Sequence, residues 1–187
     1  MEEDVNKSLE VLKNGGTIVY PTDTIWGIGC DATNPKAVEK VFQIKNRPSQ
    51  KSFIILLNSI KYLNKYILEI PDVAEQLFSV ADNPLTVVLP GAKNLAHNLI
   101  PEEGTIALRI PQDTFCQTLL SRFKKPIVST SANRSGDSAP SVFSEINQQI
   151  LKKVDYVVNW RRSETTPGQP SSIIKVGLNG EVEIIRD

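Results

Sequence analysis

The chain has 187 residues, a length typical of one domain, and its 40% apolar content is enough to supply a hydrophobic core. The 21 Lys and Arg residues balance 21 Asp and Glu residues, so no overall basic field favours nucleic-acid binding. No apolar run is long enough to span a bilayer, and the N-terminus lacks a hydrophobic signal region. These two features predict a cytoplasmic protein without membrane contact. The length predicts one domain over residues 1–187.

The first part of the chain predicts helices separated by a short buried strand. Apolar residues at helical spacing predict a first helix that ends before Gly15, and residues 17–20 then form a strand. Asn34 and Pro35 are typical of the N-cap and first turn of a second helix. That helix should end before Pro48, because the residue before a proline disfavours helical geometry.

Strands and helices alternate along the rest of the chain. Short apolar runs predict strands at residues 53–57, 85–89, 106–110, 127–129, 172–176 and 181–185. Helical patterns occupy residues 61–68, 72–80 and 112–123. Asn179-Gly180 is a strong hairpin signal between the last two strands, so at least one antiparallel pair belongs to the sheet. The prediction is an α/β fold: a twisted, mixed parallel and antiparallel sheet with surrounding helices.

A cluster of cations follows the second predicted helix. Lys45, Arg47 and Lys51 lie close together in the sequence. Residues two apart share a face on extended chain but not on a helix, so a helix that ends here should release Lys45 and Arg47 onto one side of a loop. This charge suits the phosphate chain of a nucleotide. A plain helix C-terminus is the alternative, since it too favours positive charge.

Polar loops follow two other predicted strands. Residues 20–29 (YPTDTIWGIG) and 129–136 (STSANRSG) are rich in hydroxyl and amide groups. Ligands in open α/β sheets bind beyond the carboxyl ends of strands, so these loops and the cation cluster should converge on one site. Taken singly, each loop could equally be an ordinary turn or helix cap.

The motifs, in this order, resemble those of the YrdC/TsaC family. They are GGTIVYPTDTIWGIGCDA (residues 15–32), K-x-R-P with Lys51 beyond it, LRIP (residues 108–111) and STSAN (residues 129–133), and the likeness runs from about residue 8 to residue 186. That family consists of threonylcarbamoyl-AMP synthases, which make the activated intermediate for modifying the tRNA adenosine beside the anticodon. The resemblance implies a YrdC-like fold in its short form, and synthesis from ATP, L-threonine and bicarbonate with release of pyrophosphate.

The resemblance also implies candidate site residues. Lys45 and Arg47 would be catalytic, and the residues that contact ATP or its phosphates would be Lys45, Arg47, Lys51, Thr105, Ser131, Asn133 and Arg186. The threonine pocket would be lined by Thr24, Arg109, Ser129 and Ser171, with the Arg109 guanidinium on the substrate carboxylate. The sequence has no pair of carboxylates at metal-site spacing, so it does not predict a metal site made by the protein itself. Mg²⁺ is therefore expected to arrive bound to ATP.

Several features leave substrate geometry and partners open. The departures from the family pattern are Trp26 for a smaller aromatic residue, Leu56 for a histidine, Ala139 for a hydroxyl residue and Pro170 for a glutamate. Trp26 should keep an aromatic wall of the pocket. Residues 159–171 are long for a connection and form either a closing lid or an ordinary loop, with Trp160 expected to anchor it to the core. Arg161 and Arg162 would add charge to the phosphate site or keep the loop soluble.

The resemblance also bears on partners. The product would pass to tRNA threonylcarbamoyl-transfer proteins, and any contact with tRNA or double-stranded RNA should be weak and local because the charges cancel. Two alternatives remain at this stage: an RNA-binding module without catalysis, and a domain that forms carbamoyl-AMP from carbamoyl phosphate.

Overall fold

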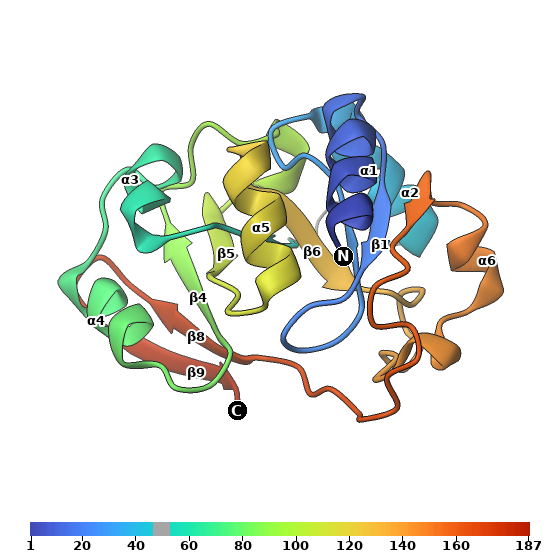
Figure 1. Cartoon of the computed structure of the whole chain (residues 1–187). Coiled ribbons are helices and arrows are strands. Elements are labelled where there is room, and N and C mark those ends of the chain that lie inside the picture. The colour runs from blue at the N-terminus through green and yellow to red at the C-terminus, as the bar shows by residue number, and fades with distance from the viewer. Residues whose placement is uncertain (47–52) are drawn as a thin grey trace.

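The structure is a computed structural model that describes residues 1–46 and 53–187 of the chain (Figure 1). Within these ranges the strands are β1 Ile18–Tyr20, β2 Gly27–Gly29, β3 Ile54–Leu56, β4 Leu85–Pro90, β5 Thr105–Arg109, β6 Ile127–Ser131, β7 Tyr156–Val157, β8 Ser172–Val176 and β9 Val182–Arg186. They form one sheet in the order β7-β1-β2-β6-β3-β5-β4-β8-β9. The pairs β7–β1, β3–β5 and β4–β8 are parallel, and the other neighbouring pairs are antiparallel. The predicted mixed sheet is confirmed.

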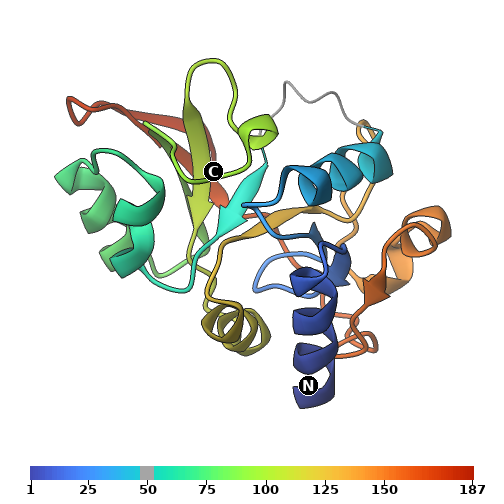
Figure 2. The same cartoon turned by 90° about the horizontal axis from the view of Figure 1, so that it is seen from above.

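The helices cover both faces of this sheet. Their bounds are α1 Glu2–Lys13, α2 Pro35–Lys45, α3 Leu63–Tyr66, α4 Asp72–Val80, α5 Thr114–Phe123 and α6 Gln148–Leu151. Figure 2 shows α1 and α5 side by side on one face and α2 on the other. None of the helices in the described ranges combines the length and apolar character that a bilayer crossing needs.

The caps of α2 follow from its sequence. Oδ1 of Asn34 accepts from the backbone N–H groups of Lys36 and Ala37, at 3.0 and 3.3 Å, and Pro35 opens the first turn, as predicted. The helix runs through Lys45 and is capped by Asn46 in the left-handed conformation at φ 51°. Lys45 is therefore a helical residue, and the prediction that it would stand on extended chain is wrong.

The predicted helix at residues 61–68 is shorter than its pattern suggests. A 3-10 turn at Ile60–Tyr62 leads into the single turn of α3. The chain then becomes extended, because Tyr66 and Leu68 form backbone hydrogen bonds with Lys93 and Gly91. A tertiary contact therefore ends this helix.

The hairpin at the C-terminus matches its sequence signal. β8 and β9 pair antiparallel, Gly180 has φ +80°, and the N–H of Gly177 donates to the carbonyl of Glu181 at 2.9 Å. This hairpin lies beside β4, so the carboxyl-terminal end of the chain reaches the same part of the sheet as β5. The arrangement brings Arg186 close to Arg109, which is far from it in sequence.

Candidate functional site

A cavity of about 440 Å³ lies against the sheet. Its lining comes from β2, β3, β4, β5, β6, β8 and β9 and from the loops that join them. Most of the site residues predicted from the sequence meet here: Thr24, Thr105, Arg109, Ser129, Ser131, Ser171 and Arg186. The polar loops therefore converge as predicted, while the role of each side chain toward a ligand stays a prediction.

The alternation of β5 aims Arg109 at this cavity. Thr105, Ala107 and Arg109 all contribute to the lining, whereas Ile106 and Leu108, between them, are fully buried in the core. Successive residues of a strand point to opposite faces, so one strand anchors itself in the core and presents three residues to the cavity. Strand alternation therefore places Arg109, which the resemblance assigns to the threonine pocket, in the lining of the cavity.

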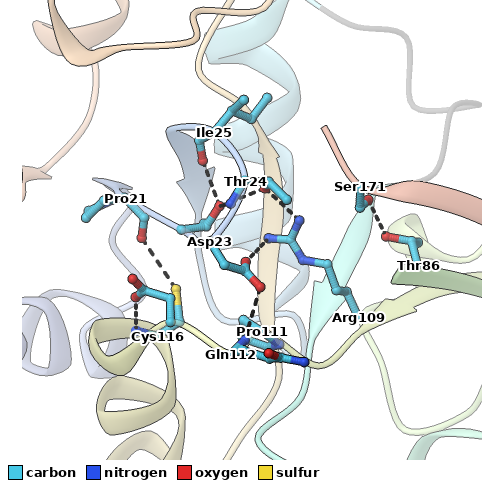
Figure 3. Close-up of polar contacts among 12 residues, drawn as sticks. Pro21, Asp23, Thr24, Ile25, Thr86, Arg109, Pro111, Gln112, Cys116 and Ser171 are labelled. Atoms are coloured by element: carbon cyan, nitrogen blue, oxygen red, sulfur yellow. Dashed lines mark hydrogen bonds and ion pairs between the residues drawn. The ribbon is translucent and has the colours of Figure 1, made fainter. Parts of the chain in front are cut away.

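The guanidinium of Arg109 is buried and held in place (Figure 3). Arg109 is only 3% exposed to solvent. Nη1 donates to Oγ1 of Thr24 at 2.7 Å, and Nη2 lies 3.3 Å from Oδ1 of Asp23. The other carboxylate oxygen of Asp23 accepts from the backbone N–H of Gln112 at 3.0 Å. Nε of Arg109 is buried without a hydrogen-bond partner. Because Arg109 lines the cavity, its guanidinium places a fixed positive charge beside the space where an anionic group could bind.

The turn before β2 orients the hydroxyl of Thr24. The hydroxyl of Thr22 donates to the carbonyl of Ile25 at 2.8 Å and accepts from the backbone N–H of Thr24 at 3.1 Å. Because its proton is used in that way, the 2.8 Å contact between the two threonine hydroxyls is donated by Thr24. Oγ1 of Thr24 thus accepts from Arg109 and keeps one lone pair for a ligand.

Ser171 and Arg186 form the opposite side of the cavity. Oγ of Ser171 lies 2.8 Å from Oγ1 of Thr86, and both residues are buried. Nε and Nη2 of Arg186 donate to the carbonyl of Ser171 at 3.0 and 2.6 Å. Partial desolvation of its guanidinium, together with the charge of Arg109, lowers the pKa of Arg186. The described lining of the cavity contains two arginines and one acidic residue, Glu103. This excess of positive charge favours the binding of an anion.

Lys45 takes a different position from the one predicted. It is 1% exposed, and Nζ donates to the carbonyls of Ser131 and Asn133 at 2.5 and 2.7 Å, with Oδ1 of Asn133 at 3.4 Å. Lys45 thus braces the end of β6, where Ser131 lines the cavity, and is itself absent from the described lining. Arg47 and Lys51 lie outside the described residues. Phosphate binding by this cluster stays a prediction.

Asn133 also stabilises the loop after β6. Its Nδ2 donates to the carbonyls of Arg134 and Asp137, at 3.0 and 2.7 Å. In this arrangement the amide holds a turn and does not contribute to the described cavity lining. Its predicted contact with the nucleotide stays a prediction.

The departures from the family pattern divide into two groups. Ala139 and Pro170 line the cavity, so both shape the site directly. Leu56 is fully buried in β3, outside the described lining. Trp26 packs against Phe143 with ring centroids 4.9 Å apart, and the cavity lining as described does not contain it. Its ring lies against Phe143 of the 3-10 turn at Phe143–Glu145, and the expectation that Trp26 forms an aromatic wall of the pocket stays a prediction.

Some residues of the site escaped the sequence reasoning. Glu103 and Thr130 line the cavity, and Thr86 supports Ser171. Thr86 carries no signal because it is one polar residue in an apolar strand. In residues 1–46 and 53–187, no group of three or more His, Cys, Asp or Glu side chains could hold a metal ion.

Comparison with known proteins identifies the family. The Sua5/YciO/YrdC family model, described as telomere recombination, matches residues 10–187. The chain belongs to the Sua5/YciO/YrdC family. A relative from Pseudoalteromonas translucida, named threonylcarbamoyl-AMP synthase, is 35% identical over 97% of this chain and 97% of its own length. A protein of that name from Photobacterium profundum is 34% identical, over 79% of this chain and 82% of its own.

Solved structures of the Sua5/YciO/YrdC family share this fold. Sua5 of P. abyssi in complex with L-threonine matches with a TM-score of 0.86 and 28% identity, over 94% of this chain. E. coli YciO matches with a TM-score of 0.86 and 25% identity, over 100% of this chain and 90% of its own. The match covers 52% of the P. abyssi chain, so this protein spans about half the length of that Sua5.

Proposed function

We propose that this protein is a threonylcarbamoyl-AMP synthase, a nucleotidyltransferase that uses L-threonine, bicarbonate and ATP. The observation that carries the proposal is the buried guanidinium of Arg109, held by Thr24 and Asp23, in a cavity that hydroxyl residues also line. A carboxylate such as that of threonine suits a guanidinium fork, and Thr24, Ser129 and Ser171 line the same cavity. The name of the relatives supports the same reaction.

The chemistry requires positioning and charge neutralisation. The threonine amine combines with bicarbonate to give a carbamate and water. A carbamate oxygen then attacks the α-phosphorus of ATP, and pyrophosphate leaves with the electron pair of the broken P–O bond. Arg109 would orient the amino acid, while Arg186 and the Lys45, Arg47 and Lys51 cluster would neutralise phosphate charge. Such a reaction needs no nucleophile from the protein.

Cofactor, partners and location follow from that reaction. Glu103 is a carboxylate in the lining but belongs to no described metal cluster, so we propose that Mg²⁺ enters with ATP, where it would offset phosphate charge. The product would serve tRNA threonylcarbamoyl-transfer proteins in the cytoplasm, where tRNA, ATP and threonine occur together. Contact with tRNA or double-stranded RNA would be weak, since the net charge is zero.

Pyrophosphate release tests this function. The purified protein should release pyrophosphate from ATP when threonine and bicarbonate are both supplied, and only at background rate when either is left out. Release that threonine does not stimulate would contradict the proposal. In that case, retained RNA binding would favour the RNA-binding alternative, and release driven by carbamoyl phosphate would favour the carbamoyl-AMP alternative.

The hydroxyl-lined pocket also predicts an order of amino-acid substrates. Threonine should be used best, then serine, and then valine and alanine. Serine lacks only a methyl group, worth about 1 to 3 kcal/mol, whereas the apolar analogues leave polar groups of the pocket without partners. The comparison uses amino-acid-dependent pyrophosphate release at saturating ATP and bicarbonate. Turnover with valine equal to that with serine would show that the pocket does not recognise the substrate hydroxyl.

A further inference from the structure

Residues 159–171, which we call the strap, run from the end of β7 to the start of β8 (Figure 1). Arg161 is its main anchor. Nη1 donates to the carbonyl of Thr22 at 3.0 Å and pairs with Oδ2 of Asp113 at 2.9 Å, while Nε donates to Oε2 of Glu164 at 2.7 Å. Arg161 therefore joins the strap to the turn before β2 and to the N-cap of α5.

The other conspicuous side chains of the strap do not take this role. Arg162 donates to the carbonyls of Val157 and Val158 and lies over the ring of Phe143. Trp160 is 41% exposed, so the expectation that it anchors the strap to the core is wrong. Neither arginine appears in the described lining of the large cavity. The guanidinium of Arg161 and the backbone of the strap itself hold the strap in place.

Backbone packing brings the strap directly onto the turn. A Cβ atom built on Gly168 would lie 1.7 Å from the carbonyl oxygen of Thr24, a distance that no side chain can occupy. The N–H of Gly168 donates to the carbonyl of Ser141 at 3.2 Å, which holds the strap in that contact. A void of only about 30 Å³ remains between the strap and the turn. The turn before β2 therefore has little room to move away from the cavity.

The backbone of Arg161 carries strain that the contacts must offset. Its φ of 68° lies in the left-handed region, which a long side chain rarely adopts. Residues in that region persist where surrounding contacts fix them, and such residues cluster at functional sites. Here the fixing contacts are those to Thr22 and Asp113.

A continuous set of polar contacts leads from Arg161 to the cavity. Arg161 holds the carbonyl of Thr22, the hydroxyl of Thr22 holds the N–H and hydroxyl of Thr24, and Thr24 accepts from Arg109. We infer that Arg161 is a positioning residue for the threonine pocket. It holds the turn before β2 from the side of the strap, and so fixes the positions of the Thr24 hydroxyl and the Arg109 guanidinium. This inference rests on the proposed function, because it takes threonine as the ligand at Arg109.

Calorimetric titration of Arg161→Asn with threonine and, separately, with ATP tests the inference. Asparagine tolerates the left-handed backbone conformation, but its side chain is too short to reach Thr22. The variant therefore removes the contact and adds no backbone strain. We expect the threonine Kd to rise roughly three- to tenfold, as for the loss of a hydrogen bond to a positioned turn, and the ATP Kd to change by less than about twofold. A purely structural role would weaken both ligands together.

Two further variants complete the test. Asp113→Asn keeps the N-cap acceptor for Cys116 but loses the charge that faces Arg161, so it should weaken threonine binding in the same direction. Combining it with Arg161→Asn should add little, because both act through one contact. Glu164→Gln is the matched control: it disturbs only the exposed side of Arg161 and should leave the threonine Kd within about twofold of wild type.

The outcomes separate the inference from the proposed function. If the wild-type protein binds no threonine, the proposed function fails and the positioning role fails with it. If the wild type binds threonine and Arg161→Asn binds it equally well, or loses ATP affinity to the same extent, the positioning role alone is overturned. Should Arg161→Asn not fold, an unchanged threonine Kd in Asp113→Asn would overturn it.

Discussion

Arg109→Lys should raise the threonine KM roughly ten- to a hundredfold while leaving the ATP KM within about twofold, since a charged hydrogen bond contributes about 1.5 to 3 kcal/mol. Lysine keeps the charge but lacks the planar fork with which the guanidinium donates to Thr24, pairs with Asp23 and would bind a substrate carboxylate. Steady-state pyrophosphate release with each substrate varied in turn measures both constants.

Arg122→Lys is the matched control for that substitution. Arg122 lies on α5 and pairs with Glu2 at the surface, so replacing it should leave both KM values unchanged. An equal rise of the ATP and threonine KM values in Arg109→Lys would place Arg109 in the phosphate site or in the structural scaffold.

Lys45→Met should reduce both stability and turnover. Methionine preserves most of the apolar stem, but the carbonyls of Ser131 and Asn133 lose the donor that they share. Losing hydrogen bonds from a charged donor costs about 1.5 to 3 kcal/mol, so the melting temperature should fall, and the displaced end of β6 should lower turnover at least roughly tenfold. Differential scanning calorimetry and pyrophosphate release at saturating substrates measure the two effects.

Lys36→Met provides the comparison on the same helix. Lys36 is exposed, and the substitution removes one positive charge from α2 without disturbing a buried contact. It should leave melting and turnover close to wild type. A Lys45→Met variant with wild-type turnover would show that neither the bracing of β6 nor a phosphate contact by Lys45 matters to the reaction.

Most of the sheet could be predicted because its strands are apolar runs bounded by turn residues. Those from β3 to β6, and the β8–β9 hairpin, lie within a few residues of their predicted positions. β2 and β7 could not be predicted: β2 is Gly-Ile-Gly and β7 has only 2 residues. Pairing with β1 makes both of them strands, and such pairing is a tertiary property that no local pattern carries.

The candidate site divides in the same way. The family resemblance points to Arg109 and to the hydroxyl residues of the cavity, and the alternation of a strand gives the direction of Arg109. The contacts that support these residues could not be predicted from the sequence. Thr86, Asp113 and Arg161 act through partners far away in the sequence, and the burial of Lys45 depends on where the end of β6 lies relative to α2.

The fate of bicarbonate carbon tests the central claim most directly. The protein would be supplied with ATP, threonine and bicarbonate labelled with a heavy carbon isotope, and the nucleotide products analysed by mass spectrometry. We predict threonylcarbamoyl-AMP that carries the label, formed only when all three substrates are present. An unlabelled threonyl-AMP, or no nucleotide that contains threonine, would contradict the proposed synthase.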